Sequence, residues 1–255
     1  MTEIEITTVA ERPELAARLW DMEDLWPEFA GYDSVGRLLY PRMVTELPEY
    51  VLVATDGDEV VARAFSVPFA LHAEGRGELP ARGWDEVLLW AFSDLRRGVA
   101  PDTVSAIEIT VATGRRGEGL SGRMLAAMRE NARSRGFAEV VAPVRPSGKH
   151  AEPDTPIHAY AYRTREDGLP YDPWLRVHVR AGATVHGVAP LSMTISASVE
   201  DWRAWTGLPF DRPGPVHVPG ALTPVHCDPS QGYAVYVEPN IWVRHPLPRP
   251  AAPRA

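Results

Sequence analysis

The segment that decides the fold of this chain is VATGRRGEGLSG, residues 111–122. A run rich in β-branched residues, 104–111, leads into it, and a helical pattern of Leu120, Met124 and Met128 follows it. Glycines let the backbone approach a ligand closely, and free N–H groups at a helix start attract negative charge. The segment therefore predicts a strand, a glycine-rich turn and a helix N-terminus that together bind a phosphate or pyrophosphate.

The spacing of Gly117, Gly119 and Gly122 also fits a dinucleotide-binding pattern, which is a weak signal when it stands alone. Dinucleotide folds place the first glycine at the strand end and an acidic residue at the tip of the next strand. Here Gly117 lies several positions beyond Val111, and Glu139 precedes the next strand instead of ending it. The surroundings therefore argue against a nicotinamide cofactor.

A protein family accounts for the segment better. Residues 111–121 resemble the coenzyme A pyrophosphate loop of the GCN5-related N-acetyltransferases (GNAT), whose pattern is V-x-P-x-x-R/Q-x-x-G-x-G/A. Thr113 replaces the usual proline, and Ser121 replaces the last small residue. The resemblance implies acetyl-CoA, or another acyl-CoA, as co-substrate and implies no metal. The residues that it assigns to this co-substrate are Val111, Arg115, Arg116, Gly117, Gly119, Leu120 and Ser121.

Composition is that of an ordinary globular protein, with 45% hydrophobic and 24% charged residues. Residues 1–5 lack a basic region and an apolar stretch, so we expect no signal peptide. The sequence contains no apolar run near the roughly 20 residues that a membrane span needs. Cys227 is the single cysteine, which excludes an internal disulfide and fits a reducing compartment. We expect a cytoplasmic protein without membrane contact.

The net charge of −8 is unfavourable for general binding of nucleic acid. The charge is unevenly spread, because basic residues outnumber acidic ones between Arg115 and Lys149. A cofactor rich in phosphate suits this basic segment, and the acidic remainder suits an amine acceptor. A solvated basic helix face is the alternative explanation.

The pattern of elements predicts an α/β (α+β) fold. Asp56-Gly57-Asp58 signals a hairpin, and a helical crossover makes strands 104–111 and 140–144 parallel neighbours. Together with the resemblance, this order predicts a GNAT-like mixed, mostly antiparallel central sheet flanked by helices. Strands are expected at 4–9, 50–54, 60–67, 104–111, 140–144, 185–188 and 192–197, and helices at 13–29, 38–47, 84–97, 119–135 and 174–181.

The expected domain organisation has three parts. Residues 1–197 form the acyltransferase domain, with a long loop insertion at 145–171 that carries several prolines and no clear period. Residues 198–245 form a packed C-terminal extension, which covers a sheet edge or makes a homodimer contact. Residues 246–255 are rich in proline and are expected to be a disordered tail.

Transfer of an acetyl group to an amine requires that the acceptor lose a proton and that the leaving thiolate receive one. In the GNAT family, a tyrosine four residues before a Gly-Phe pair commonly protonates the sulfur. His178 occupies that position before Gly182, and Ala183 replaces the phenylalanine. The resemblance therefore implies a catalytic role for His178, while a histidine buried in the core is the alternative.

Glu108 is the candidate for the base, because some family members place a catalytic glutamate in this region of the central strand. The strand alternation puts Glu108 and Thr110 on one face, so a hydrogen-bonded strand residue without a chemical role is the alternative. Trp20, Trp26 and Phe29 are expected to line an acceptor pocket or to belong to the core.

Two further parts of the sequence carry candidate binding side chains. Lys149 is a candidate phosphate contact or a solvated lysine. His226-Cys227-Asp228 lacks a second ligand pair at a useful spacing, so it predicts no metal centre.

The function that these residues predict is an acyl-CoA-dependent N-acyltransferase that moves acetyl to the amine of a small molecule. One alternative is the same fold with a carrier-protein thioester or another activated donor. The other is a catalytically silent CoA-binding or regulatory module, an interpretation left open by His178 in place of tyrosine.

Overall fold

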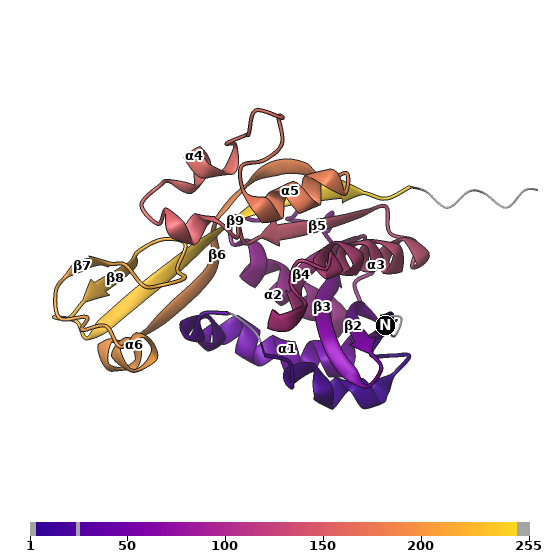
Figure 1. The fold of residues 1–255 in the computed structure, drawn as a ribbon, viewed down its shortest axis with the longest axis horizontal. Coiled ribbons are helices and arrows are strands. Elements are labelled where there is room, and N and C mark those ends of the chain that lie inside the picture. Colours follow the sequence, from indigo (N-terminus) through magenta and orange to yellow (C-terminus); the bar gives the residue numbers. More distant parts are fainter. Residues whose placement is uncertain (1–3, 24–25, 249–255) are drawn as a thin grey trace, which may run out of the picture.

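A nine-stranded, mostly antiparallel sheet organises residues 4–23 and 26–248, which the computed structural model describes (Figure 1). The strand order is β1-β2-β3-β4-β5-β9-β8-β7, and β6 pairs with the other edge of β9. Among the strands of the described residues, only β4 and β5 run parallel, as predicted. The predicted fold class is therefore confirmed. The strands are β1 (Glu5–Thr8), β2 (Val51–Asp56), β3 (Glu59–Phe69), β4 (Thr103–Val111), β5 (Glu139–Val144), β6 (Thr184–Ser198), β7 (Gly214–Val216), β8 (Val225–Asp228) and β9 (Tyr233–Pro246).

Helices cover the sheet. α1 packs against α2, α2 lies against β3 and β6, and α3 lies against β2, β3, β4 and β5. Among the described residues, none of the helices is long and apolar enough to cross a membrane. The helices are α1 (Ser34–Glu46), α2 (Gly83–Arg97), α3 (Leu120–Ser134), α4 (Ile157–Ala161), α5 (Pro173–Arg180) and α6 (Val199–Thr206), with 3₁₀ turns η1 (Pro13–Trp20), η2 (Glu28–Tyr32), η3 (Pro48–Tyr50), η4 (Thr113–Arg115) and η5 (Lys149–Ala151).

The continuous helix predicted over 13–29 does not form. η1 ends at Trp20, and η2 starts only after Pro27. Proline lacks the N–H group of a helical turn and keeps the preceding residue extended, so the chain turns here instead of continuing as one helix. Residues 24–25 of the predicted helix lie outside the described part of the chain.

α1 begins earlier than predicted because Asp33 caps it, accepting a hydrogen bond from the backbone N–H of Gly36. Gly36 therefore lies inside the helix instead of breaking it. A Cβ atom at Gly36 would lie 2.8 Å from the ring of Trp84. The glycine thus allows α1 to approach the start of α2 closely.

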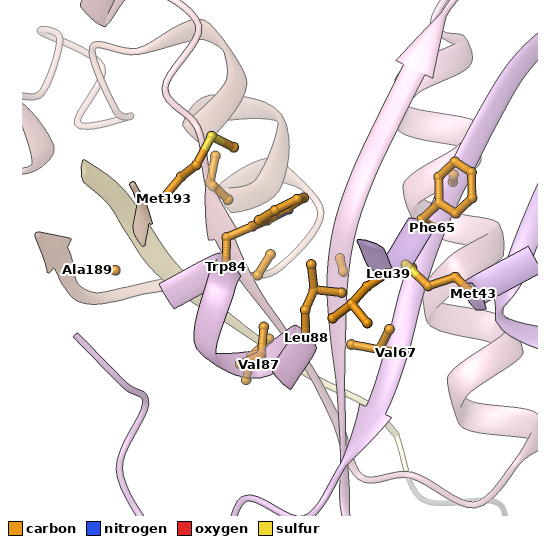
Figure 2. Packing of buried hydrophobic residues seen from close by; sticks show 14 of the residues in the cluster. Leu39, Met43, Phe65, Val67, Trp84, Val87, Leu88, Ala189 and Met193 are labelled. Atoms are coloured by element: carbon orange, nitrogen blue, oxygen red, sulfur yellow. The ribbon is translucent and has the colours of Figure 1, made fainter. Parts of the chain in front are cut away.

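The core between α1, α2 and β3 is apolar. Figure 2 shows Leu88 of α2 against Leu39 of α1, with Val67 of β3 beside them, and Trp84 beside Met193 of β6. All of these side chains are buried, and burying one such side chain stabilises the fold by about 1.5–3 kcal/mol. This packing fixes the position of α1 and α2 relative to the sheet.

The two parallel strands separate soon after they meet. β4 pairs with β5 at Val104–Val140 and Ser105–Val141, while β5 pairs with β9 along its whole length. From Ala106 onward, the edge of β4 therefore faces a gap in the sheet. This separation of β4 and β5 positions the candidate site.

The strands predicted at 185–188 and 192–197 form one long strand, β6, with irregular pairing between Ala189 and Met193. β9 pairs with β6 along one edge, and with β8 and then β5 along the other, and its long ribbon is visible in Figure 1. Most of the region expected as an extension thus belongs to the same sheet as the rest of the chain. The domain division at residue 197 stays a prediction, and residues 249–255 of the expected tail lie outside the described residues.

Candidate active site

A cavity of about 590 Å³, here called the loop cavity, opens where β4 and β5 separate. Its walls come from β4, the glycine-rich turn, β5, α5 and β9. Every residue that the sequence assigned to the site lines this cavity. These residues are Glu108, Val111, Arg115, Arg116, Gly117, Gly119, Leu120, Ser121 and His178.

The turn before α3 has the backbone conformation that its glycines suggest. Gly117 and Gly119 have φ values of +85° and +78°, a region that other residues adopt at a cost of about 1–2 kcal/mol. Gly119 is the N-cap of the 15-residue α3 and offers no side chain to its first turn. The N–H groups of that turn therefore have no side-chain cap, and the first residues of α3 line the loop cavity, an arrangement that is able to bind an anion.

The two arginines of the turn have different surroundings. Arg115 bonds to Asp56 at 2.8 Å and to Glu118 at 3.0 Å, which ties the turn to the β2–β3 hairpin. The Glu118 side chain is 45% exposed, so its carboxylate is turned toward Arg115 and solvent. Arg116 forms no ion pair within the described residues and lines the loop cavity.

Glu108 is buried and held by three donors. Its Oε1 accepts hydrogen bonds from Nε of Arg63 and Oγ1 of Thr110, each at 2.8 Å. Its Oε2 accepts from the hydroxyl of Tyr40 at 2.6 Å. Burial and the charge of Glu108 raise the pKa of Tyr40 well above its usual value, so the phenol stays a donor. Since a carboxylate offers about four acceptor positions, one remains for a further donor.

His178 is 2% exposed and forms a pair with His245 of β9, with 2.8 Å between Nδ1 of His178 and Nε2 of His245. Burial lowers the pKa of His178 to about 3 and that of His245 to about 4, so both rings are neutral at pH 7. The edge of Trp174 packs on His178, with ring centres 4.6 Å apart. His178 is thus a buried residue that also lines the loop cavity, and its catalytic role stays a prediction.

A second cavity of about 370 Å³, here called the helix cavity, lies beside α1. It shares Trp84, Glu108 and Met193 with the loop cavity, together with Trp26 and Pro27. The two cavities therefore meet at the buried carboxylate of Glu108.

Two of the three aromatic residues proposed for an acceptor pocket lie in the helix cavity. Trp20 and Trp26 line it. Phe29 instead packs against Trp202 and Tyr236 in the core, with ring centres 5.7 and 5.2 Å away.

Residues of β9 complete the loop cavity and were missed in the sequence. Glu238 is 1% exposed and accepts from Arg145 Nε at 3.0 Å, from Tyr236 at 2.8 Å and from Asn240 at 3.1 Å. Tyr236, Glu238 and Asn240 alternate along the strand, so they share one face. Polar residues at this spacing in an apolar strand were the available signal.

Lys149 is not the solvated lysine of one sequence hypothesis, and it does not line the loop cavity, as the other hypothesis of a phosphate contact requires. It is fully buried, and its Nζ donates to the carbonyl oxygens of Glu152, Pro153 and Leu222 at 2.6, 3.2 and 2.8 Å. Within the described residues there is no group of three metal-binding side chains, and Cys227 is buried in β8.

Comparison with known proteins gives relatives of similar length. No family model matches the sequence. The arginine N-acetyltransferase avaD of Aspergillus versicolor is 32% identical over 275 residues, covering 95% of this chain and 93% of that protein. This degree of likeness over nearly the whole of both chains indicates a shared family.

Two solved structures share the fold. The loading GNATL domain of CurA from Lyngbya majuscula superposes with a TM-score of 0.62 at 16% identity, covering 96% of this chain and 98% of that one. The GNAT-like decarboxylase GphF in complex with isobutyryl-CoA gives 0.55 at 17% identity, covering 96% and 100%. With the avaD relative and the loop at residues 111–122, they show that the chain belongs to the GCN5-related N-acetyltransferase superfamily.

Proposed function

We propose that this enzyme transfers acetyl from acetyl-CoA to an amine of arginine or of a similar small cationic molecule. Its similarity to known relatives shows that it is an N-acetyltransferase. The meeting of the two cavities at Glu108 carries the proposal, because donor and acceptor then reach one point from different sides. The avaD relative, an arginine N-acetyltransferase, supports this class of acceptor over a carrier-protein donor or a silent CoA-binding module.

The loop cavity suits the donor. We assign Arg116 and the backbone amides from Gly117 to Ser121 to the pyrophosphate, because they combine a cation without an ion pair and the N-terminus of α3. Val111 and the free edge of β4 are assigned to the pantetheine arm, which pairs with backbone groups. Acyl-CoA supplies an activated thioester, and the residues of the cavity hold and orient it.

Glu108 is proposed to receive the proton of the acceptor amine, directly or through water. Glu108 lines both cavities, and one acceptor position of its carboxylate remains for a further donor. Arg63, Thr110 and Tyr40 keep the carboxylate in one orientation. A base that is positioned in this way contributes about 10²–10⁴ to the rate.

His178 is proposed to stabilise the leaving sulfur as a neutral hydrogen-bond donor. With its pKa lowered to about 3 by burial, the ring does not become an imidazolium near neutral pH. If Nε2 of His245 donates to Nδ1 of His178, the Nε2–H of His178 is free to donate. His245 is then a positioning residue that sets the tautomer of His178.

A coupled assay tests the proposal. Acetyl-CoA and a panel of small amines are incubated with the protein, and free thiol is measured. Release of thiol with arginine or related amines, together with acetylated product, is the expected result. Tight binding of CoA without transfer to any amine would overturn it. The homodimer contact, the cytoplasmic location and the absence of nucleic-acid and membrane partners stay predictions.

A further inference from the structure

Asp33 is a buried carboxylate, and one of its two oxygens accepts no hydrogen bond from the described residues. The residue is 2% exposed and lines the helix cavity. Its Oδ2 accepts from the backbone N–H of Gly36 at 2.5 Å and caps α1. Its Oδ1 is buried and has no hydrogen-bond partner among the described residues. A buried acceptor without a donor has lost its hydrogen bonds to water without replacement, which is most costly for a charged group, so such an oxygen points to a missing ligand group.

Asp33 also lacks the counter-charge that Glu108 and Glu238 have. Glu108 pairs with Arg63 at 2.8 Å, and Glu238 pairs with Arg145 at 3.0 Å. Asp33 has no ion pair within residues 4–23 and 26–248. A cation bound in the helix cavity would supply the missing charge.

The pKa values in this region reflect the same unbalanced negative charge. Burial raises the pKa of Asp33, and the charge of Glu238 raises it further. Burial and the charge of Asp33 raise the pKa of nearby Asp85 to about 8. A cationic ligand would relieve this repulsion and favour the ionised form of Asp33.

Aromatic side chains surround the same space. Trp26, Tyr40 and Trp84 line the helix cavity with Asp33. Flat aromatic faces attract a guanidinium or ammonium group, and guanidinium also stacks on them. The volume of about 370 Å³ lies within the usual range of small-ligand pockets, about 300–1,000 Å³.

We propose that Asp33 binds a second cationic group of the acceptor, one that does not react. The reacting nitrogen then lies beside Glu108, and the second cation lies at Asp33 between the aromatic walls. The preferred substrates are small molecules that carry two cationic groups, as arginine does in its α-ammonium and guanidinium groups. The inference rests on the proposed function and adds the determinant of substrate class.

Matched acceptors test this assignment. Citrulline replaces the guanidinium of arginine with a neutral urea, and 5-guanidinopentanoate lacks the α-amine. Mass spectrometry of acetylated arginine shows which nitrogen reacts. If the α-amine reacts, citrulline is the analogue that lacks only the second cation. If the guanidinium reacts, 5-guanidinopentanoate is that analogue. In the wild-type protein, kcat/KM for arginine should exceed that for this analogue by about 100-fold, because an unpaired buried charge costs several kcal/mol.

Asp33→Asn is the informative variant, since asparagine caps a helix as well as aspartate does. We expect kcat/KM for arginine to fall by about 100-fold and kcat/KM for the mono-cationic analogue to change by less than about threefold. Glu28→Gln is the matched control, because Glu28 lines the same cavity but is exposed, and its effect should be small. Titration calorimetry with arginine in the presence of CoA gives a readout that does not require turnover.

The outcomes separate the two proposals. An equal loss for both acceptors in Asp33→Asn, or a wild-type protein that does not distinguish them, overturns the role of Asp33 and leaves the acetyltransferase activity standing. Absence of transfer to any amine overturns the proposed function. In that case, unchanged arginine binding in Asp33→Asn would overturn the Asp33 assignment as well, whereas weakened binding would support it.

Discussion

The loop cavity and the helix cavity meet at Glu108, but the protein builds their binding groups differently. The phosphate end of the loop cavity is formed by exposed glycines and by the backbone amides at the start of α3. The charged groups buried in the wall of the helix cavity are instead side chains, those of Asp33, Arg63 and Glu108, which lie among aromatic residues. In the proposed function, backbone groups and Arg116 recognise what all acyl-CoA molecules share, and side chains of the helix cavity select the acceptor.

This difference has an energetic consequence. A substitution in the turn changes one local conformation at the surface, whereas a substitution in the helix cavity leaves a buried charge without its partner. We therefore expect the acceptor side to be more sensitive in both stability and activity. The following changes test that contrast.

Replacement of Glu108 by glutamine should have the largest effect. Arg63 would remain buried without the carboxylate that it now contacts at 2.8 Å. We expect the free energy of unfolding to fall by about 3–5 kcal/mol. We also expect kcat/KM to fall by about 10²–10⁴, the contribution of a positioned base. Urea denaturation and the thiol-release assay measure the two effects.

Glu118→Gln is the control for stability, because that exposed carboxylate pairs with Arg115 at the surface and should contribute little. A Glu108→Gln protein as stable as the wild type would contradict the buried ion pair. Unchanged kcat/KM in the same variant would remove the proposed base.

The histidine pair predicts a loss of stability in acid. Because the pKa values of His178 and His245 lie at about 3 and about 4 in the folded protein, the unfolded chain binds protons first as the pH falls below about 6.5. The stabilising contribution is complete above that pH. At pH 5 we expect each histidine to lower the free energy of unfolding by about 2 kcal/mol relative to pH 7.

The measurement compares urea denaturation at pH 7 and pH 5 for the wild type and for a His178→Gln, His245→Gln variant. The difference between the two proteins isolates the histidines, since Asp33 and Asp85 titrate in both. If both proteins lost equal stability between these pH values, the rings would not be buried and neutral.

For the reaction itself, His178→Phe should lower kcat more than it changes KM, because the proposed hydrogen bond strengthens as the sulfur gains charge.

Gly119→Ala should weaken CoA binding moderately. Alanine at a φ of +78° costs about 1–2 kcal/mol, and the amides that follow bind a pyrophosphate only in this conformation. Titration calorimetry should show about a tenfold higher Kd for CoA. Gly122→Ala is the matched control, because that glycine lies within α3 and a Cβ there would meet no atom within 4 Å. Equal affinities in both variants would refute the role of the turn.

The two cavities also differ in how far the sequence predicts them. The turn at residues 111–122 is a local pattern, in which glycines follow a strand and precede a helix, so neighbouring residues determine it. The helix cavity depends on contacts between distant segments. Asp33 reaches it only because Pro27 interrupts the expected helix and Gly36 lets α1 approach Trp84.

The same reasoning applies to β9. Its alternating pattern predicts a strand, but the sequence of β9 alone does not specify that the strand pairs with β5 and β6. Glu238 and His245 therefore could not be assigned to the site, although the first shares a face with Tyr236 and the second pairs with His178. Most strands expected from the sequence are present. Which strands lie next to one another determines which residues form the site.

Glu118→Gln should give the smallest effect on the ligand side. Its carboxylate lies in the turn that we assign to the pyrophosphate, yet it is 45% exposed and bonded to Arg115 at 3.0 Å. Because solvent and salt screen exposed charges, we expect CoA affinity to rise by less than about threefold, and the gain to disappear at about 0.5 M salt. A rise of more than about tenfold that persists in salt would mean that the carboxylate faces the ligand. The loop cavity would then depend on a desolvated side chain, as the helix cavity does, and the contrast between the two would fail.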